Sequence, residues 1–309
     1  MAQYKLTMDF CHPRYWLAWS GIFLLFITSF LPYSTLLIIG KLLGKISFYI
    51  AKSRRKIAQR NIEICFPELS TKEVNKKVHK NFENVGIALL EMAMAWFWPR
   101  WRINKLLQVT GIEHLEAAKK ANKGIIFLGA HFLTLEMGAR ALGVVQPCSA
   151  VYRKQKNPVL DYWFYWGRMR EHNAMLDRKD LKSMLRTLKN GQALWYAPDH
   201  DYGRHKSSVF ARFLTVENAN TVAGTSTLAR VKHSCVIPVF LKRLPSSKGY
   251  ELVFYPALEN FPTQDIQADA RTTNQEVEKM IAECDDQYMW MHRRFKTRPE
   301  GEESFYQHL

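Results

Sequence analysis

Short apolar runs alternate with helical patterns through the C-terminal two thirds of the chain. The runs are brief, apolar and bounded by turn residues, as buried strands are. They lie at residues 124–130, 149–153, 193–198, 235–240 and 251–255. Helical spacing of apolar residues occurs at 158–170, 179–189, 218–231 and 266–284. This alternation predicts an α/β domain with a mostly parallel sheet flanked by helices.

A helical stretch precedes the alternating part. Ser70 and Glu73 have the spacing of a capping box and predict the start of a long helix that ends near Trp98. Its apolar residues recur at helical spacing and predict a face that packs in the core. The basic run at 52–60 predicts another helix face just before it, which would meet anionic headgroups if it lay beside a bilayer.

The N-terminal part contains a long uncharged segment. Residues 15–39 include no Asp, Glu, Lys or Arg, and their number matches the roughly 20 residues that cross a bilayer. Trp16 and Tyr33 near the two ends are typical of interfacial anchors. We expect residues 1–45 to form a membrane anchor with a transmembrane helix at about 15–39, and Pro32 leaves a kinked or re-entrant path open. A cleaved signal peptide is disfavoured because no small-x-small cleavage site follows.

Charge orients this anchor and restricts the partners. Cations are far more numerous after the apolar segment than before it, which predicts that residues 46–309 form a domain on the cytoplasmic side. Across the chain, 44 Lys and Arg against 28 Asp and Glu give a net charge of +16, which favours an anionic partner. The five cysteines are scattered, so the sequence indicates neither a disulfide framework nor a zinc site.

The candidate chemistry starts at the first apolar run. His131 follows this run and Glu136 lies five residues later, which on one helix would turn the two side chains about 140° apart. They converge only if His131 ends the strand and Glu136 lies in the first turn of a helix, with Thr134 as a possible N-cap. The imidazole would then be a general base oriented by a carboxylate. Arg153 and Asp199 follow other predicted strands and are expected at the same edge of the sheet.

These residues allow several kinds of site, which the sequence separates only in part. Arg153 is a candidate for a carbonyl or phosphate contact, and the turn that begins at Asp199 is a structural or substrate-positioning turn more readily than a metal site, because adjacent ligands rarely point at one ion. No Gly-x-Ser-x-Gly elbow supports an enzyme nucleophile. The basic C-terminal stretch lacks a nucleic-acid-binding motif, so lipid phosphates are the better partner for it.

Several long blocks resemble one known family almost from end to end. The chain is similar to the late (secondary) acyltransferases of lipid A biosynthesis, and within them to the Kdo2-lipid IVA lauroyltransferase branch. The blocks that carry the resemblance lie at residues 12–17, 61–67, 94–99, 131–136, 175–181, 195–203 and 292–299.

The resemblance implies a glycerolipid-acyltransferase-like fold and a single-pass enzyme of the inner membrane whose active site faces the cytoplasm. It implies transfer of an acyl chain, usually lauroyl, from acyl carrier protein to a hydroxyl of a 3-hydroxyacyl chain on Kdo2-lipid IVA. The family's His-x4-Asp/Glu motif matches His131 and Glu136, and Arg168 becomes a candidate essential arginine for a phosphate or an oxyanion. A thioester is already activated, so no cofactor or metal is expected. An acidic carrier protein and a phosphorylated acceptor both match the positive charge.

Two other functions remain open from the sequence. The same residue pair would serve acyl transfer to a glycerolipid, and the anchor with its basic surface would also suit a non-enzymatic protein that binds anionic lipid. The length of the donor chain is not readable, since one methylene in an apolar pocket discriminates by only about 1–3 kcal/mol.

Overall fold

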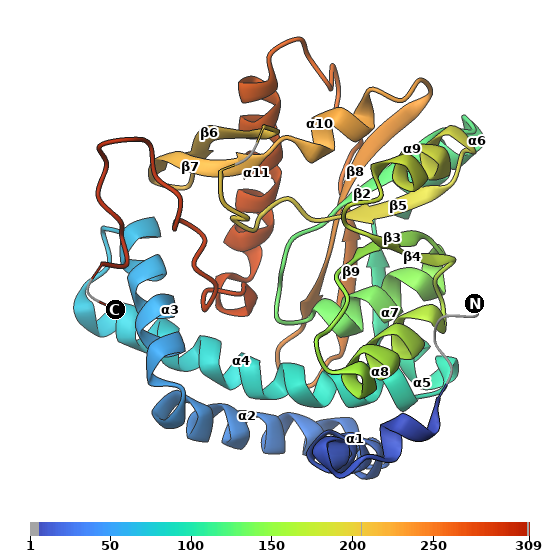
Figure 1. The fold of residues 1–309 in the computed structure, drawn as a ribbon, viewed down its shortest axis with the longest axis vertical. Coiled ribbons are helices and arrows are strands. Elements are labelled where there is room, and N and C mark those ends of the chain that lie inside the picture. Colours follow the sequence, from blue (N-terminus) through green and yellow to red (C-terminus); the bar gives the residue numbers. More distant parts are fainter. Residues whose placement is uncertain (1–5, 205, 308) are drawn as a thin grey trace.

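A seven-stranded sheet forms the centre of the computed structural model, which describes residues 6–204, 206–307 and 309 (Figure 1). In sheet order the strands are β1 (Leu107–Thr110), β9 (Tyr250–Phe254), β8 (Ser234–Arg243), β2 (Gly124–Leu128), β5 (Ala193–Tyr196), β3 (Ser149–Tyr152) and β4 (Ala174–Asp177). All neighbours are parallel except β8 and β9. The predicted α/β class with a mostly parallel sheet is confirmed.

Helices cover both faces of this sheet, because the central strand β2 is apolar on both sides. Ile125 and Phe127 pack into one core together with α6 (Ile112–Lys120) and α7 (Leu135–Val145). Ile126 and Leu128 pack into another core with α9 (Leu181–Lys189) and α10 (Gly224–Ala229). Each core residue of β2 is at most 3% exposed, which fixes the register of the strand at the centre of the domain.

A third core lies beside the sheet, where a two-stranded hairpin packs on the long C-terminal helix. The hairpin consists of β6 (Ser208–Phe213) and β7 (Val216–Val222), and the helix is α11 (Ile266–Glu283). Other elements of the described residues are α3 (Lys52–Cys65), α4 (Thr71–Phe97), α5 (Arg100–Asn104), α8 (Pro158–Met169) and 3-10 turns at Met8–Cys11, Pro13–Tyr15 and Asp285–Gln287. The predicted capping box is present, since Ser70 and Glu73 bond reciprocally at the start of α4.

The N-terminal segment departs from the expected single helix over residues 15–39. It forms α1 (Trp16–Thr28) and α2 (Tyr33–Ile50), separated at residues 29–32. Pro32 causes the break because its ring excludes the preceding residue from helical geometry. Within the described residues, α2 is the one helix long and apolar enough to cross a membrane, and it continues past the expected boundary at residue 45.

Two further expectations needed correction. The helix predicted at 218–231 is helical only over α10; its first residues, 218–222, belong to strand β7. Strands β1, β4 and β6 were not expected from the sequence. These edge and hairpin strands carry no long apolar run in the sequence.

Candidate active site

His131 lies in the loop between β2 and α7, three residues after the strand ends. The loop passes close to the neighbouring strand β5: a Cβ at Gly129 would lie 2.4 Å from Trp195 Nε1, so only glycine fits there. The His131 side chain is 17% exposed and lines a cavity at this edge of the sheet. The expected position of the imidazole at the carboxyl end of a strand is therefore confirmed.

Asp199 holds this imidazole. Its Oδ1 lies 2.7 Å from His131 Nδ1, and its Oδ2 accepts hydrogen bonds from the His131 backbone N–H at 2.9 Å and from the Tyr288 hydroxyl at 3.0 Å. Burial raises the pKa of Asp199, but the charge and hydrogen bonds of His131 outweigh it and hold the pKa below its usual range. An ionised Asp199 fixes the Nδ1–H tautomer, so the Nε2 lone pair is available as a base.

Three imidazole rings are stacked in this part of the site. The rings of His131 and His200 lie 3.5 Å apart at an angle of 11°, and His292 stacks on the other face of His200 at 3.8 Å. Burial, aided by the charge of His131, lowers the pKa of His200 to about 2 and that of His292 to about 4. Both are neutral near pH 7, so His131, at the end of the stack, packs on an uncharged ring rather than on a second cation.

Glu136 lies in the first turn of α7, as expected, but its carboxylate pairs with Arg168 on α8. Arg168 Nη2 lies 2.5 Å from Oε1, and Nε lies 3.3 Å from Oε2. Thr134 precedes the helix, yet its hydroxyl donates to the carbonyl of Leu241 instead of capping. The contact expected between Glu136 and His131 is thus replaced by the contact of Asp199.

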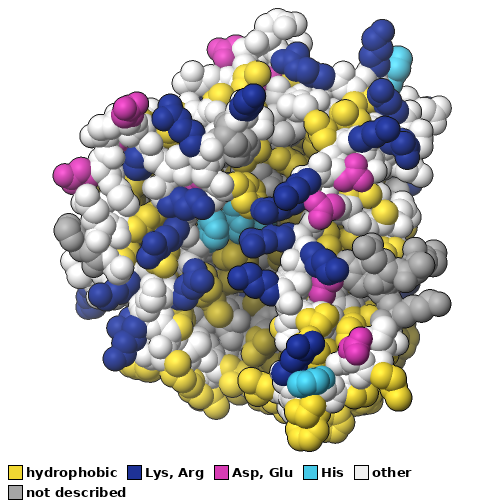
Figure 2. Space-filling model, in the orientation of Figure 1, with side chains coloured by type: hydrophobic (Ala, Val, Ile, Leu, Met, Phe, Trp, Pro, Cys, Tyr) yellow, Lys and Arg dark blue, Asp and Glu magenta, His cyan; other side chains and the backbone are white. Residues whose placement is uncertain are grey.

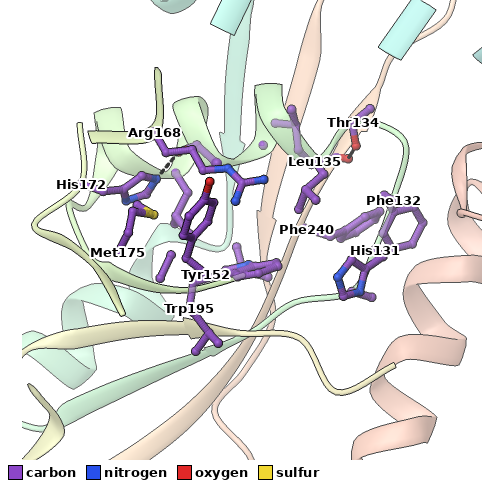
Figure 3. Close-up of a pocket in the computed structure, with 18 of the residues that line it drawn as sticks. His131, Phe132, Thr134, Leu135, Tyr152, Arg168, His172, Met175, Trp195 and Phe240 are labelled. Atoms are coloured by element: carbon purple, nitrogen blue, oxygen red, sulfur yellow. Dashed lines mark hydrogen bonds between the residues drawn. The ribbon is translucent and has the colours of Figure 1, made fainter. Parts of the chain in front are cut away.

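An apolar cavity of about 270 Å³ separates His131, held by Asp199, from Arg168, held by Glu136. Figure 3 shows His131 with Phe132 at one side and Arg168 with Tyr152 at the other, with Trp195 along one wall. Arg168 is sandwiched between aromatic rings, with its guanidinium carbon 5.5 Å from the Tyr152 ring centre. The pKa of Arg168 is held above its usual value because Glu136 outweighs the opposing effect of burial.

Basic side chains surround the mouth of this cavity. Arg153 and Arg178 are exposed and line it. Arg153 therefore lies at the shared edge of the sheet, as predicted. Figure 2 shows Lys and Arg side chains around a group of histidines near the middle of one face. The C-terminal basic stretch contributes less than expected to this surface, because Arg294 is buried and donates to the carbonyl of Asn220 at 2.7 Å.

The turn that begins at Asp199 contributes to a structural contact and to a cluster of polar side chains in the site. Asp201 accepts hydrogen bonds from the backbone and hydroxyl of Thr297 and from Asn220, which ties the C-terminal loop to the domain. Donor atoms of His131, Asp199 and His200 lie within 4.8 Å of one another, the spacing of a possible metal site. However, the parallel rings point their lone pairs into parallel planes, and both Asp199 oxygens already accept hydrogen bonds. This geometry suits proton transfer better than metal ligation.

Sequence reasoning missed the carboxylate partner of the base, although a signal for it existed. Strands β2 and β5 are parallel with Leu128 paired to Tyr196, and His131 and Asp199 each lie three residues beyond that pair. Adjacent parallel strands that end in register bring such residues together. Tyr288 and His292 come from the C-terminal segment, and no periodicity in the sequence places that segment beside β2 and β5.

Comparisons with known proteins identify the family of the chain. Residues 4–297 match the family model of bacterial lipid A biosynthesis acyltransferases. The chain is 48% identical to the lipid A biosynthesis lauroyltransferase of Escherichia coli K12, with 98% of each chain covered. It is 42% identical to the palmitoleoyltransferase of the same strain, over 98% of this chain and 99% of that one. It is 29% identical to the lipid A biosynthesis myristoyltransferase of the same strain, over 96% of this chain and 92% of that one.

Among solved structures, the 1-acyl-sn-glycerophosphate acyltransferase of Thermotoga maritima matches with a TM-score of 0.37 and 14% identity, over 79% of this chain and 97% of that one. The protein is an acyltransferase by class. It belongs to the bacterial lipid A biosynthesis acyltransferase family, which implies an acceptor of the lipid A type.

Proposed function

We propose that the protein transfers a lauroyl chain from acyl carrier protein to the hydroxyl of a 3-hydroxyacyl chain on Kdo2-lipid IVA. The observation that carries this proposal is the arrangement of His131, whose Nδ1 is bound to the buried Asp199 and whose ring lines an apolar cavity. Such a cavity suits a fatty acyl chain, and the base lies where an acceptor hydroxyl would enter. The 48% identity to a lauroyltransferase supports lauroyl over the other donors.

In the proposed mechanism, His131 Nε2 accepts the proton of the acceptor hydroxyl as its oxygen attacks the thioester carbonyl. Asp199 stabilises the imidazolium that forms, as in the hydrolase triad, but the nucleophile belongs to the substrate. The tetrahedral intermediate then breaks its carbon–sulfur bond. The leaving thiolate takes the proton from His131, so the enzyme returns to its starting state and the products are the ester and the thiol of the carrier protein.

We assign Glu136 and Arg168 to the opposite side of the cavity. Glu136 occupies Nε and Nη2 of the guanidinium, which leaves Nη1 for an oxygen of the substrate. This oxygen belongs either to a phosphate of the acceptor or to the developing oxyanion. In both cases Glu136 acts through Arg168, because its own contacts are to that side chain.

The electrostatics of the mouth support anionic substrates. Arg153 and Arg178 line the opening and are exposed. Both the acyl carrier protein and the phosphorylated acceptor are acidic, so the basic surface would raise the rate of encounter with them. We further propose that the apolar N-terminal helices attach the enzyme to the inner membrane with the catalytic domain on the cytoplasmic side. No cofactor enters the mechanism, because the thioester supplies the activated carbonyl.

The test is a direct assay of the purified full-length protein with lauroyl-acyl carrier protein. Kdo2-lipid IVA, glycerol 3-phosphate and lysophosphatidic acid are offered as acceptors, and products are identified by mass spectrometry. We expect acylation of Kdo2-lipid IVA, and a loss of about 10²–10⁴-fold in His131→Ala. His114→Ala on α6, outside the cavity, is the matched control and should keep wild-type turnover. Preference for a glycerolipid acceptor would refute the proposal, and near wild-type turnover of His131→Ala would refute the base.

A further inference from the structure

The first N-terminal helix, α1, contacts the catalytic domain at both of its ends. Before the helix, the ring of Phe10 lies edge-on to Tyr162 of α8, and at its start Trp19 lies edge-on to Trp163, with ring centres 6.3 and 6.2 Å apart. After the helix, the carbonyl of Ser29 accepts a hydrogen bond of 2.6 Å from Trp98 Nε1. Both ends of α1 therefore lie on the same body of the protein.

The second helix, α2, runs along α4 (Figure 1). Three glycines allow the two backbones to touch: a Cβ on Gly86 of α4 would lie 2.1 Å from the carbonyl oxygen of Gly40 and 2.2 Å from the nitrogen of Gly44. Beyond this crossing, the ring of Phe48 stacks on His79 at 3.7 Å. Since α4 also packs against α7 and α8, α2 is part of the catalytic domain and not a separate anchor.

The outer faces of both helices are apolar. Among the described residues, twelve of the twenty-two exposed large hydrophobic side chains lie between residues 16 and 50. They are Trp16, Leu17, Phe23, Leu24, Phe26, Ile27, Phe30, Ile38, Leu42, Ile46, Tyr49 and Ile50. We call this set the apolar face; Figure 2 shows hydrophobic side chains along the lower edge of the molecule, where Figure 1 places α1 and α2. A soluble domain does not leave such a surface uncovered.

Charge identifies what covers the apolar face. No acidic residue occurs between Asp9 and Glu63, whereas exposed cations border the face at Lys41, Lys45 and Lys52. Aromatic side chains next to a row of cations suit the headgroup region of an anionic bilayer. A second copy of the chain would bring the same positive charges together, which disfavours self-association on this surface.

The lengths and contacts of the helices are incompatible with a simple span. The 13 residues of α1 extend about 20 Å, short of the roughly 30 Å hydrocarbon core. The 18 residues of α2 reach about 27 Å, but one side of this helix is packed on α4 along its length. Either helix would have to leave the domain in order to cross the bilayer.

We propose that α1 and α2 bind the enzyme to one leaflet of an anionic phospholipid bilayer without crossing it. The apolar face lies in the interface, and the segment before α1 stays on the same side of the membrane as the catalytic domain. This inference rests on the proposed membrane attachment and replaces the single transmembrane helix expected from the sequence. It does not depend on which lipid is acylated.

Cys11 provides a direct test of this topology. Its thiol is exposed just before α1, whereas the other four cysteines are buried. A membrane-impermeant maleimide is added to intact and to permeabilised spheroplasts that contain the full chain, with Cys11→Ser and Cys11→Ser/Lys120→Cys as references for background and for the catalytic-domain side. We expect Cys11 to react only after permeabilisation, as Lys120→Cys does. Reaction in intact spheroplasts would overturn the proposal, and so would failure to react after permeabilisation.

A second measurement tests the apolar face itself. Binding of the purified protein to vesicles of phosphatidylglycerol and phosphatidylethanolamine is compared with that of Leu42→Asp/Ile46→Asp. The matched control, Leu181→Asp/Ile266→Asp, changes two apolar side chains that are also exposed but lie outside the apolar face. We expect at least a tenfold loss of vesicle binding only in the first variant, and equal binding of both variants would refute the assigned surface. Acyl transfer to a detergent-dispersed acceptor, measured on the same samples, shows whether the catalytic assignment holds independently.

Discussion

Replacing Asp199 by Asn isolates the part of the proposed mechanism that depends on this carboxylate. Oδ2 accepts hydrogen bonds from two donors, the His131 backbone N–H and the Tyr288 hydroxyl, and Oδ1 faces His131 Nδ1. An amide keeps the two donors satisfied only if its oxygen replaces Oδ2. Its NH₂ group then points at Nδ1, which must become an acceptor. The proton moves to Nε2, and the imidazole is no longer a base toward the cavity.

The magnitude follows from two contributions. An imidazolium and a carboxylate whose charge centres lie about 4 Å apart attract by about 4 kcal/mol at an effective dielectric constant of about 20. This attraction corresponds to roughly 10³-fold in rate. The wrong tautomer adds to the loss, and the equivalent Asp-to-Asn change in a serine protease costs about 10⁴-fold. We expect kcat to fall by about 10³–10⁴-fold in Asp199→Asn, with little change in the KM for the acceptor.

The assay is steady-state transfer of lauroyl from acyl carrier protein to Kdo2-lipid IVA, with circular dichroism and thermal unfolding to verify the fold. Asp201→Asn is the matched control, because Asp201 is equally buried but bonds to Thr297 and Asn220 and makes no contact with His131. Asp201→Asn should act mainly on the free energy of unfolding and much less on kcat. If Asp199→Asn retains turnover within about threefold of wild type, the imidazole does not depend on this carboxylate and the mechanism is wrong.

Three other predictions follow from contacts of the same structure. Arg168→Lys cannot form the two-point contact with Glu136 and should lower kcat/KM about 10–100-fold in the same transfer assay, whereas Glu136→Gln, which keeps one hydrogen bond, should lose less. The folded-state pKa of His292 is lowered to about 4, so the unfolded chain takes up its proton first and stability is lost as pH falls from about 6.5 toward 4. The free energy of unfolding of His292→Gln, measured with denaturant, should therefore exceed that of wild type by on the order of 1–2 kcal/mol at pH 5 and by nothing at pH 8. Glu91→Ala leaves Arg243 buried without its partner and should lower the free energy of unfolding by about 3–5 kcal/mol, of which Arg243→Met in the same chain should restore a part.

The core of the fold was predictable because it depends on local patterns. Strands β2, β5 and β8 are apolar on both faces, and the start of α4 carries its own capping box. The edge strands β1 and β4 were missed, since neither contains a fully buried residue. The division between α1 and α2 follows from Pro32, which the sequence had marked as a possible kink without showing that the two halves would fold back on α4.

The site was predictable to the level of the sheet edge and no further. His131, Arg153 and Asp199 were expected at the carboxyl ends of strands, where the structure has them. The choice of partner for His131 needed the register of β2 against β5, which depends on long-range packing. The stack of His200 and His292 needed the path of the C-terminal segment, and that path is fixed by buried contacts such as Asp201 with Thr297 rather than by any local pattern.

The two carboxylates of the site act on different charges because of where their backbones lie. Asp199 extends from a strand parallel to β2 and faces the imidazole, so it is placed to stabilise a charge that appears only during the reaction. Glu136 begins a helix and meets Arg168, whose charge is permanent, so it fixes the position of a cation before any substrate binds. Removal of the Glu136 carboxylate would release Arg168 without changing the tautomer of His131, whereas removal of the Asp199 carboxylate would leave the imidazole without its partner. Loss of Asp199 should therefore act mainly on kcat, and loss of Glu136 should act on both kcat and the KM for an anionic substrate.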